Sequence, residues 1–224
     1  DNLDVDGTTT LDGVVSIADS IVHTGDTNTS LRFPAADTIT LETAGSERIR
    51  IDSSGRMGIG EASPSQLLQL GGDSGDAVIS LMRTNNAANG DAYGHVFFEN
   101  SSDAVLASIS ARRESAADDV YLAFSTQATG GSITERLRID SSGRLLIGTT
   151  TEGSSSADDL TVSGSGEIGI TIRSTNSSQC NLFFSDGTSG AAEYAGVIRY
   201  DHASNYMSIW TNGDSEKVRI TSAG

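Results

Sequence analysis

The stretch "SERIRIDSSGRMGIG" at 46–60 returns as "TERLRIDSSGRLLIG" at 134–148 and, in a shorter form, as "SEKVRITSAG" at 215–224. We call these three stretches the repeated phrase. In its first two copies apolar residues share one parity: Ile49, Ile51, Met57 and Ile59, then Leu137, Ile139, Leu145 and Ile147. Period two is typical of a β-strand with one buried face and one polar face. Gly55 and Gly143 close Ser-Ser-Gly segments and tolerate positive φ, so the phrase predicts a strand–turn–strand corner.

The sequence ahead of the phrase repeats as well. Residues 81–127 align with residues 171–212. The alignment equates Phe97-Phe98 with Phe183-Phe184, Phe124 with Trp210, His95 with Asn181, and Gly94 approximately with Cys180. Repeats of this kind indicate a modular architecture. The expected segments are narrow strands over 1–30, a short repeat over 31–72, a long repeat over 73–156, and a second long repeat over 157–224.

The composition excludes several classes of protein. Hydrophobic residues make up 36% and aromatic residues 5% of 224 residues, and the net charge is −16. Such a surface repels phosphates, which argues against binding to bare nucleic acid or to an anionic membrane. No apolar run approaches the roughly 20 residues that span a bilayer. The single cysteine, Cys180, rules out an internal disulfide framework and a multi-cysteine metal site.

Strand patterns separated by Asp, Asn, Ser and Gly clusters fill nearly the whole chain, and no stretch of a dozen residues has helical periodicity. The best helix candidate, 63–70, fits a strand equally well. We expect the chain, which starts at Asp1 and stops inside the phrase, to be part of a longer polypeptide. Short strands with few aromatic residues bury little apolar area, so a lone ribbon is marginal against its conformational entropy. The expected fold is therefore an all-β, elongated fibre, a homotrimeric β-prism or triple-β-helix-like shaft of hairpin-rich modules.

Eight of the 14 basic residues lie in the phrase. We expect these cations to bridge to carboxylates across strands or between subunits, where a bidentate arginine pair fixes register. The alternative is a solvated face, on which ion pairs contribute little. The candidate repeat and interface residues are Arg48, Arg50, Asp52, Gly55, Arg136, Arg138, Asp140, Gly143, Lys217 and Arg219.

Other candidate sites are weaker. Asp4, Asp6 and Asp12 faintly resemble a calcium loop but lack its closing bidentate Glu. The histidines, His23, His95 and His202, are too scattered for a triad or a zinc site. Neighbouring carboxylates on one strand point to opposite faces, so the pairs at 118–119 and 158–159 cannot flank a glycosidic bond. The glycines of 164–169 have no following helix to form a phosphate loop. Trp210 could stack on a sugar, but its alignment favours a core position.

The stretches "NLDVDGTTTLDG" (2–13), 21–64 and 198–224 resemble the repeat text of bacteriophage tail fibres, and most closely those of marine phages such as cyanophages. The resemblance covers almost the whole chain. It implies a homotrimeric β-rich shaft in the virion, extracellular in use and assembled in the host cytoplasm with other phage tail proteins. It also implies that a C-terminal tip or intramolecular chaperone domain can follow such a shaft.

The sequence thus predicts a structural shaft segment involved in host adsorption, with no enzyme activity, cofactor or metal. One alternative is a receptor-binding module whose loops at 85–94, 99–103 and 185–193 recognise a host-surface glycan or protein. A polysaccharide depolymerase is the other alternative. It would need carboxylates clustered in a groove, and the sequence does not place any there repeatedly.

Overall fold

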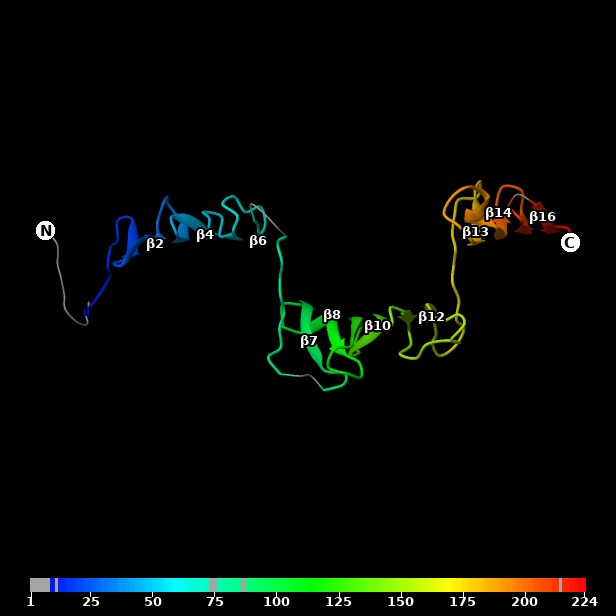
Figure 1. Cartoon of the computed structure of the whole chain (residues 1–224), viewed down its shortest axis with the longest axis horizontal. Helices are drawn as coiled ribbons and strands as arrows, with labels where there is room; N and C mark the ends of the chain where they lie inside the picture. Colours follow the sequence, from blue (N-terminus) through cyan, green and yellow to red (C-terminus); the bar gives the residue numbers. More distant parts are fainter. Residues whose placement is uncertain (1–8, 11, 73–75, 86–87, 214) are drawn as a thin grey trace. The chain divides into compact units, whose positions relative to one another are not determined.

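The structure is a computed structural model that describes residues 9–10, 12–72, 76–85, 88–213 and 215–224. It is all-β, as the sequence predicts, and its strands form three open sheets (Figure 1). Two compact units, Asp1–Leu81 and Met82–Gly224, divide the chain; the first unit holds the first sheet and the second holds the other two. Within the described residues, no helix has the length and apolar character that crossing a membrane requires.

The strands follow one another in sheet order. The first sheet consists of β1 (Ser20–His23), β2 (Asp26–Arg32), β3 (Ile39–Thr43), β4 (Ser46–Ile51), β5 (Met57–Ile59) and β6 (Leu68–Leu70). The second consists of β7 (Ala92–Glu99), β8 (Val105–Arg113), β9 (Val120–Gln127), β10 (Ile133–Ile139), β11 (Leu145–Ile147) and β12 (Leu160–Val162). The third consists of β13 (Gln179–Phe184), β14 (Gly196–Asp201), β15 (Tyr206–Thr211) and β16 (Ser215–Thr221), with a short 3₁₀ helix, η1 (Gly190–Tyr194), between β13 and β14.

The repeated phrase forms the predicted corner. β4 and β5 pair antiparallel around the first Ser-Ser-Gly turn, and β10 and β11 do so around the second. Gly55 and Gly143 adopt φ angles of +74° and +85°. The chain then returns to add a parallel strand, β6 or β12, beside β5 or β11. The segment at 63–70 thus ends in a strand, and the two full corners are built alike.

The sheets extend across two of the expected segment limits. The limit at 30/31 falls inside β2, which pairs with both β1 and β3. The limit at 156/157 precedes β12, which pairs with β11. The first and second sheets therefore have the same number and order of strands, and the first repeat is as complete as the second.

Strand register defines one frame common to the three sheets. Rows of paired residues cross the sheets as Arg32–Thr40–Arg50–Gly58, His95–Ser110–Ala123–Arg138–Leu146 and Asn181–Arg199–Ser208–Arg219. This frame confirms the alignment of His95 with Asn181 and of the two Phe-Phe pairs. The alignment of Phe124 with Trp210 is wrong by one residue. Trp210 pairs with Glu216 as Ser125 pairs with Glu135, whereas Phe124 occupies the position of Ile209 on the opposite face.

The buried positions lie on the face that carries Arg50, Arg138 and Arg219, which we call the arginine face. Thr40, Ala123 and Ser208, the row neighbours of these arginines, are each 1% exposed. Long side chains can cover small neighbours and backbone while their polar ends reach water. In the single chain the apolar face is thus not the buried one, and its burial between copies of the chain stays a prediction.

The apolar face, opposite the arginine face, is open in all three sheets. Many of its aliphatic and aromatic side chains are about 36–56% exposed, among them Leu41, Ile59, Phe98, Leu122, Ile209 and Ile220. Monomeric proteins rarely expose contiguous apolar surface of this kind unless it binds a partner.

A β-bulge sits at the same position of every phrase. In the first sheet Leu41 pairs with Ile49 and Glu42 with Glu47, which leaves Arg48 as the extra residue. Arg136 and Lys217 are the extra residues in the second and third sheets. The bulge shifts side-chain parity by one residue, so the phrase Glu lies on the same face as the Arg three positions later.

Glycine at the end of the phrase holds the bulge. The Gly60 and Gly148 amides donate to the carbonyls of the bulge residues Arg48 and Arg136, at 2.8 and 2.9 Å. Both glycines have positive φ, and a Cβ on either would lie 2.2–2.5 Å from a backbone oxygen. The last residue of the first two copies of the phrase, Gly60 or Gly148, therefore has to be glycine.

Deletion of Arg136 should remove the bulge and restore strict alternation, which moves Glu135 to the apolar face. We expect the amides of β9 and β10 to exchange with deuterium at least about tenfold faster, because local opening becomes easier. Arg136→Ala is the matched control. It keeps the bulge and loses only the hydrogen bond from Arg136 Nε to Thr126 Oγ1. Equal protection in the two variants would contradict a structural role of the bulge.

Candidate functional site

Each phrase carries a bidentate Glu–Arg pair on the arginine face, with the same atoms bonded in all three copies. Arg50 Nε and Nη2 donate to Glu47 Oε1 and Oε2, both at 2.7 Å. The corresponding distances are 2.5 and 2.9 Å for Arg138 with Glu135, and 2.9 and 2.7 Å for Arg219 with Glu216. The bidentate carboxylate partners of these arginines thus lie within the same strand, and Arg138 has Glu114, after β8, as a second carboxylate at 4.0 Å.

Two of the paired arginines also lie over an aromatic ring. The guanidinium carbon of Arg138 is 3.9 Å from the Tyr121 ring centroid, and that of Arg219 is 4.0 Å from the Tyr206 centroid. Each tyrosine lies two residues before the buried small residue of its strand, Ala123 or Ser208. A guanidinium held between a carboxylate and a ring is fixed in orientation. The stacked arginine and tyrosine side chains thus cover the strands on the arginine face.

Asp52 and Asp140 cap the turns. The Oδ1 atom of Asp52 accepts from the Ser54 and Arg56 amides, and Oδ2 accepts from Arg56 Nε. Asp140 makes the equivalent bonds with Ser142 and Arg144. Bonds from Arg56, its backbone amide first, lower the pKa of Asp52. Burial opposes ionisation of Asp140, but the bonds from Arg144 and Ser142 outweigh it and lower the pKa of this carboxyl as well.

The bulge cations make no ion pair with any described residue. Arg48 Nε donates to Thr43 Oγ1 at 2.9 Å, and Lys217 Nζ donates to Ser215 Oγ at 2.7 Å. Arg136 contacts Thr126 as stated above. Of the candidate cations, the second arginine of each phrase therefore bonds within the chain, and the first basic residue is available to other carboxylates.

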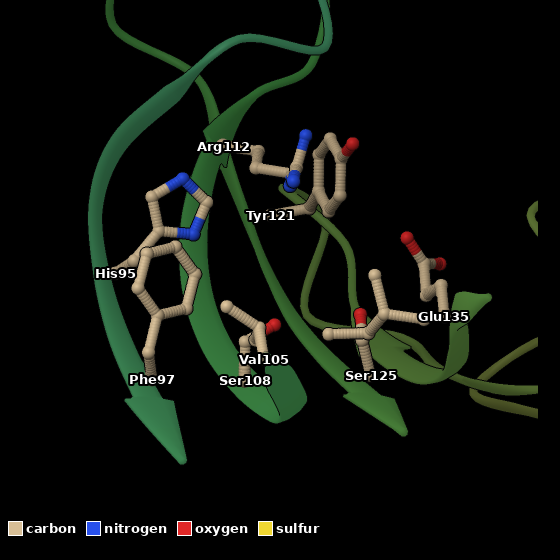
Figure 2. A pocket seen from close by; sticks show the side chains of 9 residues that line it. His95, Phe97, Val105, Ser108, Arg112, Tyr121, Ser125 and Glu135 are labelled. Carbon is tan, nitrogen blue, oxygen red and sulfur yellow. The ribbon is translucent and has the colours of Figure 1, made fainter. Parts of the chain in front are cut away.

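A depression of about 460 Å³ opens on the arginine face of the second sheet (Figure 2). Figure 2 shows the rings of His95 and Phe97, from β7, on one side and Glu135, from β10, on the other, with Ser108 and Ser125 between them. Arg112 and Tyr121, which are paired across β8 and β9, also line it. The lining thus comes from four adjacent strands.

Three side chains at this depression, those of His95, Arg112 and Tyr121, each lack a hydrogen-bond or ion-pair partner within the described part of the chain. His95 stacks on Phe97 with ring centroids 4.7 Å apart, and its Nδ1 atom is buried without a hydrogen-bond partner. Burial, and then the charge of Arg112, lower the pKa of His95, so the ring is neutral at pH 7. Arg112 donates to Ser110 Oγ and to the Gly90 carbonyl but makes no ion pair with a described residue. Tyr121 Oη has no hydrogen-bond partner among the described residues.

The third sheet has a depression of about 350 Å³ at the corresponding position. In the common frame Phe183 replaces Phe97, Val197 replaces Ser108 and Trp210 replaces Ser125. Arg199, on the same strand as Val197, lines it and donates to Asn181 Oδ1 at 2.8 Å; it too makes no ion pair with a described residue. Both depressions thus combine an aromatic ring with an arginine that makes no ion pair with a described residue, although Arg199 takes the frame position of Ser110 and not that of Arg112.

The other candidate residues do not converge. No three His, Cys, Asp or Glu side chains of the described residues group as metal ligands would. Asp119 accepts from the Ser115 and Ala116 amides in a turn, and Asp158 accepts from Arg144 Nη1. The calcium-like series lies mostly outside the described residues, since Asp4 and Asp6 are not among them.

No protein-family model matches the chain, and no curated protein matches it significantly. The features of the chain that bear on its function are the phrase, the open apolar faces and the depressions of the arginine face.

Replacement of the paired arginines should show that a buried Glu–Arg pair contributes more to stability than an exposed one. The Arg138 side chain is 10% exposed and that of Arg219 45%. A pair shielded from water leaves a costly unpaired carboxylate when it is broken. We expect Arg138→Gln to destabilise the second sheet by about 2 kcal/mol and Arg219→Gln to affect the third sheet less. Hydrogen exchange resolved by sheet measures both effects; a larger loss for Arg219→Gln would contradict this ranking.

The turn carboxylates predict acid sensitivity. The pKa values of Asp52, Asp140 and Glu216 are lower in the folded chain than in the unfolded one. Their contribution to stability is therefore complete above the unfolded values, about pH 4, and is lost as the pH falls through the folded values. We expect the midpoint of thermal unfolding to be nearly constant from about pH 7 to 5 and to fall below about pH 4. Asp140→Asn should lower the midpoint of thermal unfolding at pH 7 and make its fall below about pH 4 shallower. An unchanged fall would show that ionised Asp140 does not contribute to the acid sensitivity.

Proposed function

We propose that this chain is a shaft segment of a homotrimeric phage tail fibre involved in host adsorption, without enzymatic activity. The observation that carries the proposal is the succession of three sheets, each built on the same bulged phrase and each with an open apolar face. An active site is needed once, whereas a shaft needs a corner at every repeat. The resemblance of the phrases to tail-fibre repeats points in the same direction.

The open apolar faces support assembly. Large aliphatic and aromatic side chains of each sheet, such as Leu41, Phe98 and Ile209, are exposed in the single chain and need a partner surface. Three identical apolar faces around one axis would cover one another and leave the arginine faces in water.

The bulge cations suit such an assembly. Arg48, Arg136 and Lys217 are exposed and repeat at one position of the frame, in a chain with a net charge of −16. Carboxylates of a neighbouring copy are the obvious partners for cations that find none in their own chain. Contacts of this type fix register more than they add stability.

Sedimentation velocity tests the assembly directly. We expect a single species of three times the chain mass of 23.2 kDa, and a thin three-fold rod in negative-stain images. A stable folded monomer or a globular particle would refute the proposal.

Leu122→Glu tests which face is covered. Leu122 is 36% exposed in the single chain, so a carboxylate there would be tolerated if this face were in water. In a trimer joined by its apolar faces the change buries three like charges, and we expect dissociation to monomers at micromolar concentration. Ser101→Glu adds the same charge in an exposed turn of the same sheet and should remain trimeric. Persistence of the Leu122→Glu trimer would show that another face forms the contact.

A further inference from the structure

The depression on the arginine face of the second sheet has the features of a ligand site that the shaft architecture does not need. The corner is already satisfied, since Glu135 bonds to Arg138 with both carboxylate oxygens. The charged side chains of the lining are Arg112 and Glu135. Glu135 is occupied by Arg138, whereas Arg112 makes no ion pair with a described residue, so Arg112 is the lining charge that can take a new partner.

We propose that this depression binds a carboxylate-bearing sugar, with Arg112 holding the carboxylate. A sugar ring has a C–H face that packs on an aromatic ring such as Phe97, and a rim of hydroxyl groups that needs donors and acceptors. The hydroxyl groups of Ser108 and Ser125 supply them along the depression. A volume of about 460 Å³ is sufficient for one or two sugar rings.

A carboxylate fits this site better than a phosphate does. One guanidinium matches one carboxylate in charge and in fork geometry. Phosphate sites in proteins usually combine several cations or converging backbone amides, and here a single arginine faces the ligand. Repulsion from the acidic chain does not prevent binding, because physiological salt screens exposed charges beyond about 8 Å.

The third sheet has a related depression with a different arginine position. Arg199 stands in the frame position of Ser110, two residues from that of Arg112, and lies beside the rings of Phe183, Tyr194 and Trp210. Both depressions lie on the face that remains in water in the proposed trimer. The accessibility of the site in the fibre thus rests on the proposed function, while its chemistry does not.

Methyl glucuronide and methyl glucoside differ only in the carboxylate and are suitable probes. Titration of the intact protein should shift the His95 ring resonances, which are readily assigned because the chain has three histidines. We expect the glucuronide to bind at least about tenfold more tightly than the glucoside, as a charge-assisted hydrogen-bonded pair provides. No binding of either sugar, or equal affinity for both, would overturn the proposal.

Variants localise the effect. Arg112→Gln should abolish the preference for the glucuronide, whereas Arg173→Gln removes the same charge at an exposed position outside the strands and should preserve it. Ser125→Trp introduces the residue that the third sheet has at this position and should fill the depression. Both sugars should then bind the protein more weakly, as measured by the shifts of the His95 resonances. A preference that survives Arg112→Gln would place the site elsewhere. Sedimentation of the same samples reports the oligomeric state separately, so loss of the trimer and loss of sugar binding are distinguishable.

Discussion

The parity of the Glu–Arg pair is the constraint on which the rest of the structure depends. Glu47 and Arg50 stand three residues apart, and in a regular strand they would point to opposite faces. A bulge at Arg48 puts them on one face, where they form two parallel hydrogen bonds. The bulge fixes the register to the preceding strand, and Gly60 fixes the bulge by donating to its carbonyl. The position of the turn follows from that register.

The pair also decides how the two faces of each sheet are used. Each paired arginine is the ladder neighbour of a small residue, Thr40, Ala123 or Ser208, and these three residues are buried in an otherwise thin sheet. The arginine face is thus covered by its own side chains. Within the described residues, no side chains do the same for the apolar face. A single chain therefore forms its Glu–Arg bonds but leaves many of its aliphatic and aromatic side chains exposed.

The sequence was sufficient to predict the local structure. It was insufficient to predict on which face of a strand each side chain lies beyond the bulge. Alternation and Ser-Ser-Gly predicted the corners, and residue type aligned Phe97-Phe98 with Phe183-Phe184. Matching by type failed for Trp210, because aromatic was paired with aromatic, whereas the bulge sets the true register and places Trp210 opposite Glu216. The Glu-x-x-Arg spacing contained the signal for the bulge, since only a parity shift allows that pair. The depressions could not be predicted, because their lining comes from up to four strands whose register has to be known first.

Comparison of equivalent strand positions in the three sheets separates positions with the same residue type from positions at which the residue type differs. Glu and the paired Arg recur in all three sheets, because their bidentate bond depends on the bulge that sets the strand register. The bulge itself requires only an extra residue, which is basic in all three sheets. Other positions that line the depressions differ: Ser108 and Ser125 in the second sheet become Val197 and Trp210 in the third. A shaft built in this way can change its surface chemistry from repeat to repeat without altering its strand register. In the proposed fibre, recognition would not be confined to loops or to a tip, because the arginine faces of the second and third sheets carry depressions with different linings.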